Sequence, residues 1–330
     1  MSGSGKKHPD RREFLALGVG ALAVATLPRA LRRRRDRLIR RQIPVMGTIA
    51  EIAVRHDNEV WAQRAIDRAL DELRRVDRTM TRFRDDSDVG RANLVAGRGV
   101  VTVSEDTATV LDQALHWAYA SEGRFDPCLG RASELWDVED RTSPPAASKV
   151  RRYAHRNLYH ALDLQRDGSV PRVRLTNPDA AVDLGGIAKG YGVDLAGQAL
   201  KDNGIFHALV NVGGDLIAMG VDEEGEPWKV GVRSPDHLNE VAQVLRVGDR
   251  AVATSGDYLR YFTYHGTRYH HLLDPRDGAP RRTPMRSITV EADRCVSADA
   301  AATALFGADA AEWDYVLRRA APGSSVVSAI

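Results

Sequence analysis

Asp183-Leu-Gly-Gly-Ile-Ala-Lys-Gly-Tyr-Gly-Val-Asp194 is a glycine-rich stretch that follows a short apolar segment and opens an amphipathic one. Residues 180–184 predict a buried strand, and the spacing of apolar residues predicts a helix over 189–200, ended by Asn203-Gly204. A glycine turn at a helix start can offer free N–H groups to a phosphate. The spacing is that of neither a P-loop nor a Rossmann turn. Taken alone, the stretch therefore indicates either tight helix packing or an anion site.

Composition places the chain among ordinary globular proteins, with 330 residues, 43% hydrophobic residues and a formal net charge of +2. Much of the basic excess lies in the first forty-odd residues, so the rest implies no nucleic-acid partner. The two cysteines, Cys128 and Cys295, are far apart and match no metal-site spacing. Each is expected to be a small buried residue, with a disulfide between them as the alternative in an oxidising compartment.

The N-terminal residues 1–28 are typical of a targeting segment. Asp10-Arg-Arg-Glu-Phe-Leu-Ala16 is a twin-arginine consensus, and the apolar run at 17–27 is too short to span a membrane. We therefore expect export of the folded protein by the twin-arginine route, to an extracytoplasmic or periplasmic location or to the cell surface. No cysteine follows the run directly, so no lipoprotein anchor is expected.

Residues 29–44 are rich in arginine and predict a solvated basic linker. The alternative is peripheral contact with anionic lipid. One catalytic domain is expected over 45–330, because no repeat and no further linker appears there.

Periodicity within this domain predicts a mixture of helices and strands without a βαβ rhythm, which indicates an α+β fold. The predicted helices cover 58–80, 104–119, 189–200 and a last region from 299 to 306, with a connector at 87–93 and a loop at 137–150. The predicted strands cover 45–54, 99–103, 206–212, 216–220, 228–233, 241–247, 251–255, 259–264 and 286–291.

Asp299 and Thr303 are four residues apart at the expected start of the last helix, so their oxygens share one face. A carboxylate with a hydroxyl suits a hard cation such as Mg²⁺. The alternative is an N-cap aspartate beside a neutral threonine. His270 and His271 are adjacent in an expected strand and would point to opposite faces, so only one of them can face a site.

Several short polar motifs recur in order along nearly the whole predicted domain. They are Met46-Gly-Thr48, Met80-Thr-Arg-Phe-Arg-Asp-Asp-Ser-Asp88 with Asn93, Gly123-Arg-Phe-Asp-Pro127, the stretch from Asp183 to Gly190, Asn211-Val-Gly-Gly-Asp215, His270-His-Leu-Leu-Asp-Pro275 and Asp299-Ala-Ala-Ala-Thr303. With these motifs, the chain from Met46 to about Phe306 resembles the ApbE family of FAD:protein FMN transferases.

The resemblance implies a compact α+β domain related to the tunnelling fold and a Mg²⁺-dependent reaction. FAD would be cleaved, FMN moved to a threonine hydroxyl of an exported acceptor protein, and AMP released. By the same resemblance Asp299, Thr303 and the carbonyl of Gly186 would hold Mg²⁺. The positions matching FAD contacts are Met46, Phe83, Arg124, Phe125, Asp126, Asp183, Lys189, His271 and Leu273.

Among these positions, Lys189 would neutralise charge on the pyrophosphate together with Mg²⁺. His271 is expected either to accept the proton of the incoming threonine or to donate a hydrogen bond to phosphate, and Asp183 is the competing base.

Phe83 stands where family members often carry tyrosine near the flavin end of the site, so a stacking surface is kept and a hydroxyl is lost. Two other activities are therefore weighed against transfer. An FAD pyrophosphatase releasing FMN and AMP would use the same site with water as the nucleophile. A non-catalytic flavin-binding module is disfavoured, since Lys189, Asp299 and Thr303 are all present.

Overall fold

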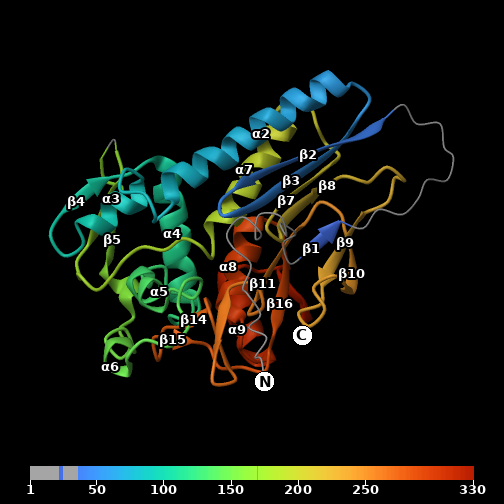
Figure 1. Ribbon diagram of the computed structural model, residues 1–330. Coiled ribbons are helices and arrows are strands. Elements are labelled where there is room, and N and C mark those ends of the chain that lie inside the picture. The colour runs from blue at the N-terminus through green and yellow to red at the C-terminus, as the bar shows by residue number, and fades with distance from the viewer. Residues whose placement is uncertain (1–21, 25–35, 169) are drawn as a thin grey trace.

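The computed structural model describes residues 22–24, 36–168 and 170–330, which Figure 1 shows as ribbons. The twin-arginine motif and most of the expected basic linker up to residue 35 lie outside the described residues. In chain order the helices are α2 (Glu59–Met80), α3 (Asp88–Leu94), α4 (Glu105–Ala120), α5 (Gly130–Trp136), α6 (Ala147–Val150), the 3₁₀ helix η1 (Leu158–Ala161), α7 (Ala188–Asp202), α8 (Cys295–Leu305) and α9 (Ala310–Ala320).

The main element is a seven-stranded sheet with strand order β17-β16-β11-β8-β7-β3-β2. Each neighbouring pair in it is antiparallel. Its strands are β2 (Arg37–Val45), β3 (Thr48–His56), β7 (Ala208–Val212), β8 (Asp215–Met219), β11 (Ala251–Gly256), β16 (Ser287–Ala292) and β17 (Ser325–Ala329). Helices together with this large antiparallel sheet confirm the predicted α+β class.

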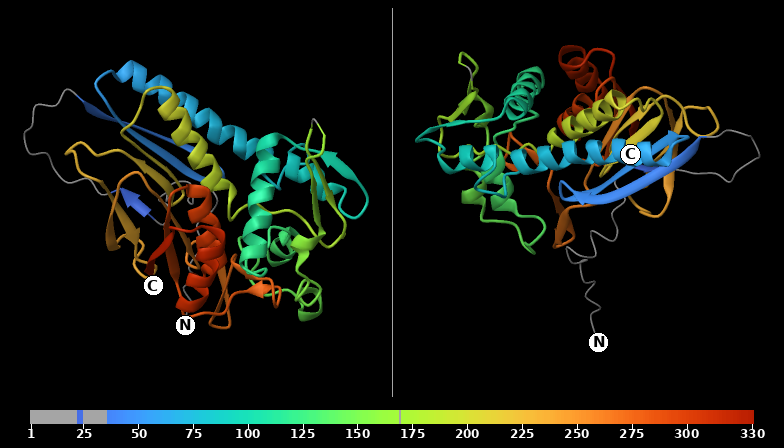
Figure 2. Two further views of the ribbon diagram at one scale, coloured as in Figure 1. Left: turned by 180° about the vertical axis from the view of Figure 1, so that it is seen from behind. Right: turned by 90° about the horizontal axis from the view of Figure 1, so that it is seen from above.

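Helices α2 and α7 cover one face of the sheet (Figures 1 and 2). Asn58 caps α2 by accepting a hydrogen bond from the Trp61 amide, and the helix then buries small and branched residues at every third or fourth position. The opposite face packs against Trp228, Val230 and Val232 of a smaller sheet. That sheet has the order β1-β9-β10, formed by β1 (Leu22–Val24), β9 (Trp228–Arg233) and β10 (Val241–Val247).

A second region is built around α4 and lies beside the sheet, with α8 between the two (Figure 2). It contains a three-stranded sheet of order β4-β6-β5, from β4 (Val100–Thr102), β5 (Leu162–Gln165) and β6 (Arg172–Leu175). Two hairpins, β12 (Tyr261–Tyr264) with β13 (Thr267–His270) and β14 (Leu273–Asp274) with β15 (Ala279–Pro280), complete the fold. Both cysteines are buried free thiols, as expected, and none of the described helices is long and apolar enough to cross a membrane.

Four local predictions were wrong. The expected strand 45–54 is interrupted at Met46 and Gly47, whose φ angles of 54° and 69° form a two-residue hairpin turn between β2 and β3. Because the residues on both sides of the turn are β-rich, the turn left no break in the alternating pattern.

The expected connector 87–93 is the helix α3, capped by Ser87, whose hydroxyl accepts from Gly90 N at 2.8 Å. Residues 180–184 are buried apart from the half-buried Asp183, yet they form only an isolated bridge from Ala181 to Leu129.

The fourth correction concerns the basic linker. From Arg37 onward this segment is the edge strand β2, paired with β3 along its whole length. Ile39 and Val45 point inward, while Arg37 and Arg40 are exposed. Charged side chains are typical of edge strands, because they discourage pairing with another chain. The arginine-rich composition therefore concealed a strand.

Candidate functional site

The site begins where α7 crosses α8. A Cβ added to Gly190 would lie 2.4 Å from the main-chain oxygen of Cys295, so only glycine allows this close approach. The crossing also lets Gly190 N donate to Asp299 Oδ2 at 3.0 Å. The glycines of the central stretch thus bring the first turn of α7, which carries Lys189, against α8.

A cluster of three charged side chains lies at this crossing. Lys189 Nζ is 2.9 Å from Asp215 Oδ2 and 3.3 and 3.4 Å from the two carboxylate oxygens of Asp299. Asp215 is 2% exposed and Asp299 3% exposed. Burial and the neighbouring charge of Asp299 raise the pKa of Asp215, although Lys189 opposes that shift. Burial would lower the pKa of Lys189, but the two carboxylates outweigh it and raise that pKa, so the ammonium stays charged.

Asp299 and Thr303 lie one helical turn apart on α8, as predicted. Thr303 Oγ1 is 3.5 Å from Gly186 O, and a Cβ on Gly186 would lie 2.7 Å from the same hydroxyl oxygen. Carboxylate, hydroxyl and carbonyl oxygens thus converge where only a glycine fits. Within the described residues no group of three or more His, Cys, Asp or Glu could hold a metal ion, but this mixed oxygen set matches what a hard cation prefers.

The alternative that Asp299 is an N-cap is wrong, because α8 begins four residues earlier, at Cys295. Asp194 satisfies the start of this helix instead. Its carboxylate accepts from Cys295 N at 2.7 Å and from Val296 N at 3.2 Å. Asp299 is therefore free of a capping role in its own helix.

Asp183 closes the glycine turn. Its Oδ1 accepts from Gly185 N at 3.0 Å, and its Oδ2 is 3.1 Å from Arg82 Nε. Both oxygens are engaged, which favours a role in shaping the turn over a role as a base. The base assignment stays a prediction.

The two histidines lie in different environments. His270 ends β13 and is buried, and its Nε2–H donates to Arg281 O at 2.9 Å. His271 follows it with an exposed side chain. Its Nδ1 is 3.4 Å from Arg260 O, so the proton is placed on Nδ1 and Nε2 keeps a lone pair. Although part of the side chain reaches the surface, the protein atoms around the ring and the charge of Arg260 lower the pKa of His271, so the ring is neutral at pH 7.

Residues 46–327 match the model of the ApbE family. The chain belongs to the ApbE family. An FAD:protein FMN transferase of Vibrio cholerae is 32% identical over 269 residues, covering 80% of this chain and 79% of that protein. A protein of the same name from Treponema pallidum is 34% identical over 278 residues, covering 79% of this chain and 76% of that one.

Solved ApbE structures share the fold. The crystal structure of the ApbE protein of Thermotoga maritima matches with a TM-score of 0.77 at 28% identity, covering 89% of this chain and 96% of that chain. The flavin transferase ApbE of Vibrio cholerae matches with a TM-score of 0.72 at 29% identity, covering 86% and 90%. The motifs that suggested the ApbE family thus lie on the fold of that family.

Two of the positions expected to contact FAD lie near a surface. Phe83 is 76% exposed, and the Arg82 guanidinium lies over its ring at 4.2 Å. Since Arg82 also pairs with Asp183, this ring is connected to the central turn. Met46 occupies the turn between β2 and β3 and packs against the cores of both regions.

Four other expected contacts are held in the protein interior or by protein partners. Phe125 and Leu273 are buried in the core around α4. Arg124 Nε donates to Ala304 O at 3.3 Å. Asp126 Oδ1 accepts from Cys128 N at 2.8 Å. Their assignment to FAD stays a prediction, while the structure gives each one a packing or bonding role.

Sequence reasoning assigned no role to three side chains of the site. Asp215 and Arg82 belong to motifs that matched the family, so the sequence marked their positions but not their roles. No sequence pattern marked Arg260. Its guanidinium pairs with Glu139 at 3.3 Å, and its carbonyl oxygen accepts from the amide of His271 at 3.2 Å.

Proposed function

We propose that this ApbE-family enzyme transfers FMN from FAD to a threonine hydroxyl of an exported acceptor protein, with Mg²⁺, and releases AMP. One observation carries the proposal: the half-buried Lys189, with the buried Asp215 and Asp299, stands beside the Gly186 carbonyl and the Thr303 hydroxyl. A charged cluster of this kind suits a diphosphate substrate, since phosphoryl transfer depends on positioning and charge stabilisation.

Asp299, Thr303 and Gly186 are the residues that would hold Mg²⁺. The bound ion would supply charge neutralisation on the diphosphate. The remaining chemistry belongs to the chain itself. Lys189 is kept protonated by its two carboxylate neighbours, so it presents a fixed positive charge to the diphosphate at neutral pH.

His271 is proposed as the proton acceptor. The threonine oxygen forms a bond to the phosphorus of the FMN half, the diphosphate P–O bond to AMP breaks, and the threonine proton passes to His271 Nε2. A neutral ring with its Nδ1–H directed at Arg260 O supports this role, because the lone pair then lies on Nε2. The alternative role, as a hydrogen-bond donor to phosphate, would need the other tautomer or the protonated ring.

For localisation we propose export by the twin-arginine route, which the Arg11-Arg12 motif supports. Export suits an acceptor outside the cytoplasm. A peripheral contact with anionic lipid is proposed only for the basic segment before β2, whose exposed Arg37 and Arg40 continue the positive charge onto the sheet edge.

The test is mass spectrometry of a candidate acceptor after incubation with the exported form of the protein, FAD and Mg²⁺. We expect the acceptor to gain one FMN on a threonine, and Asp299→Ala to abolish the gain. Without an acceptor, free FMN and AMP should form slowly or not at all.

The pyrophosphatase alternative keeps one specific observation in its favour, the exposed Phe83 ring without a hydroxyl. It predicts FMN and AMP at the same rate with and without acceptors, and no modified threonine. FAD that is bound and left uncleaved would contradict both enzymes and support a flavin-binding module.

A further inference from the structure

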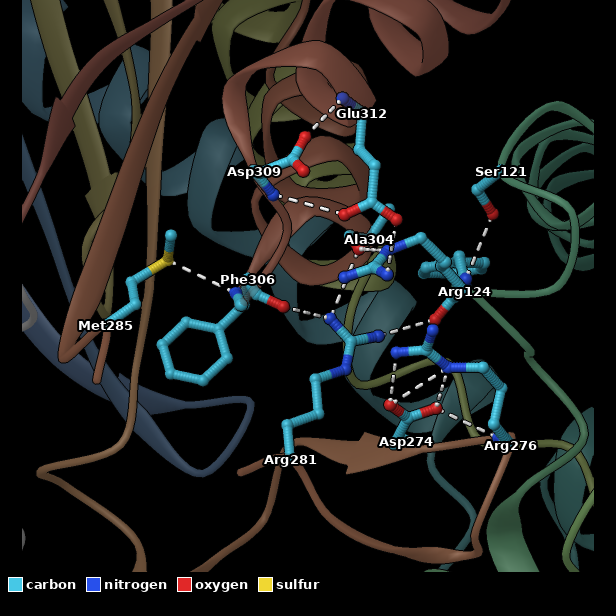
Figure 3. Close-up of polar contacts among 12 residues, drawn as sticks. Ser121, Arg124, Asp274, Arg276, Arg281, Met285, Ala304, Phe306, Asp309 and Glu312 are labelled. Atoms are coloured by element: carbon cyan, nitrogen blue, oxygen red, sulfur yellow. Dashed lines mark hydrogen bonds and ion pairs between the residues drawn. The ribbon is translucent and has the colours of Figure 1, made fainter. Parts of the chain in front are cut away.

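Arg281 is a buried cation with an unusual set of partners. The residue is 7% exposed. Its five side-chain hydrogen bonds within the described part of the chain all go to main-chain carbonyls. Figure 3 shows those to Arg124, Ala304 and Phe306. The acidic groups that act on it, Asp274 and Glu312, are each paired with another arginine, Arg276 and Arg124. Buried arginines are ordinarily paired with carboxylates, so this arrangement needs an explanation.

Three of the carbonyls belong to the end of α8. Nη1 lies 2.9 Å from Thr303 O, 3.2 Å from Ala304 O and 2.6 Å from Phe306 O, so one of its two N–H groups is shared between two carbonyls. The last carbonyls of a helix lack partners within the helix and carry its negative dipole end, so a cation there is stabilised. Burial lowers the pKa of Arg281 to about 10, which still leaves it charged at neutral pH.

The other two carbonyls lie on different segments. Nη2 donates to Arg124 O at 2.5 Å, and Nε donates to Leu273 O at 3.1 Å. The main chain of Arg281 adds two bonds on either side of His271: its amide donates to Leu272 O at 2.9 Å, and its carbonyl accepts from His270 Nε2 at 2.9 Å.

One side chain thus joins three segments that each carry a motif of the family: the end of α8, the 123–127 loop and the 270–275 segment. Arginine alone has enough donors in a fixed plane for this. Lysine would offer a single ammonium group and could not reach all three.

We propose that Arg281 is a positioning residue for flavin transfer: it fixes the last turn of α8, and with it Thr303, relative to the segment that carries His271. Its side-chain hydrogen bonds reach the main chain of Thr303, but neither the oxygens proposed to hold Mg²⁺ nor the ring of His271, the proposed proton acceptor. The inference rests on the proposed function, because Thr303 and His271 take their roles from it. Residues that orient metal ligands from behind typically alter metal affinity by about 10–100-fold when they are replaced.

The test compares Arg281→Met and Arg281→Lys with Arg250→Met and Arg250→Lys. Arg250 is a matched control, because it also joins separate segments, through Glu291, Asp293 and the carbonyl of Gly323 at 2.9 Å, but it lies directly before β11, away from the proposed site. Each variant is assayed well below its melting temperature, and Mg²⁺ is titrated to separate apparent Mg²⁺ affinity from kcat. Hydrogen exchange of residues 270–274 and 299–306 is measured in the protein without Mg²⁺ and FAD.

For Arg281→Met we expect apparent Mg²⁺ affinity to fall by about 10–100-fold and both peptides to exchange faster, with Arg281→Lys between it and wild type. The Arg250 variants should lose thermal stability while keeping Mg²⁺ affinity within about twofold. Arg281 variants with wild-type Mg²⁺ dependence, or Arg250 variants with the same loss, would overturn the proposal. If Arg281→Met does not fold, Arg281→Lys carries the same comparison.

A wild-type protein that transfers no FMN would instead overturn the proposed function. The exchange comparison needs neither FAD nor Mg²⁺, so it still decides whether Arg281 holds the two segments. Unchanged exchange in both peptides would refute that.

Discussion

Asp88 and Asp215 are both buried aspartates, 7% and 2% exposed, in different regions of the molecule. Asp88, in the region around α4, meets a full set of donors. Its Oδ2 accepts from Ser104 N, Ser104 Oγ and Thr107 Oγ1 at 2.7–2.8 Å, and its Oδ1 pairs with Arg91 at 2.7 Å. Burial alone would raise the pKa of Asp88, but these hydrogen bonds lower it.

Asp215, at the start of β8, faces the opposite situation. Its buried Oδ2 has the Lys189 ammonium at 2.9 Å, and that ammonium is shared with Asp299. Two carboxylates therefore compete for one cation, and burial with the charge of Asp299 raises the pKa of Asp215.

The two aspartates show how a structural carboxylate differs from one held in a site. Asp88 completes the start of α4 and leaves nothing for a ligand. The Asp215 cluster keeps excess negative charge out of water, a costly arrangement that a bound cation would relieve. The number of hydrogen-bond donors around a buried aspartate thus distinguishes a structural carboxylate from a site carboxylate better than its degree of burial does.

The largest effect is expected for Asp299→Asn. FMN transfer should fall by about a thousandfold, because the variant loses the charged oxygen that we propose as a Mg²⁺ ligand, and with it several kcal/mol of transition-state stabilisation. The free energy of unfolding without metal should change by less than about 1 kcal/mol, since asparagine can still accept from Gly190 N and repulsion with Asp215 is relieved. The rate of acceptor labelling measures the effect on transfer, and calorimetry measures the effect on stability. A loss of stability as large as the loss of activity would make the cluster structural, like Asp88.

The next effect is expected for His271→Gln, with transfer lowered by about a hundredfold. Because the pKa of His271 is lowered, its ring stays neutral as the pH falls, and the acid limb of kcat/KM in the wild type should lie below about pH 6.5. In the variant that limb should disappear. An identical acid limb in both proteins would assign it to another group and leave His271 as a phosphate contact.

The sequence was informative where a pattern is local. The apolar face of α2, the glycine turn before α7 and the i, i+4 pair Asp299 and Thr303 follow from spacing within one element, and the structure has all three. Residue spacing did not predict the turn between β2 and β3, because the two strands that flank this tight turn have the same β-rich composition.

The rest of the site depends on contacts between distant segments. Arg281 bonds to carbonyls, which every residue possesses, so no sequence pattern marks its partners. Asp215 becomes distinctive only when the fold places Asp299 beside it. Phe125 matched a family motif, but only the packing around α4 reveals that its ring is buried.

A smaller effect is expected for Asp88→Asn, and it should fall on stability alone. Replacing one carboxylate oxygen by an amide leaves a donor facing donors and loses the charge paired with Arg91, which should lower the free energy of unfolding by about 2 kcal/mol. kcat for transfer should stay within about twofold of wild type at temperatures where the variant is folded. Asp85→Asn, at an exposed position in the same segment, is the control and should change stability by less than about 0.5 kcal/mol. A fall in kcat with unchanged stability would show that Asp88 serves the reaction and is not a structural carboxylate.

The smallest effect is expected for Asp126→Asn, at a carboxylate that lies between the two extremes. Asp126 Oδ1 has the Cys128 amide as a donor, and burial raises the pKa of Asp126 to about 6, above its ordinary 3.8. A raised pKa in the folded state means that the carboxylate weakens the fold progressively from about pH 4 to about pH 6 and fully above it. The variant should therefore be more stable than wild type by about 1 kcal/mol at pH 7, with the difference vanishing below about pH 4. Unfolding experiments from pH 4 to pH 7 measure this difference in stability. FAD titration of the same variant tests whether Asp126 also binds FAD. Weaker FAD binding without the gain in stability would place Asp126 with the Asp215 cluster as a group held for its ligand.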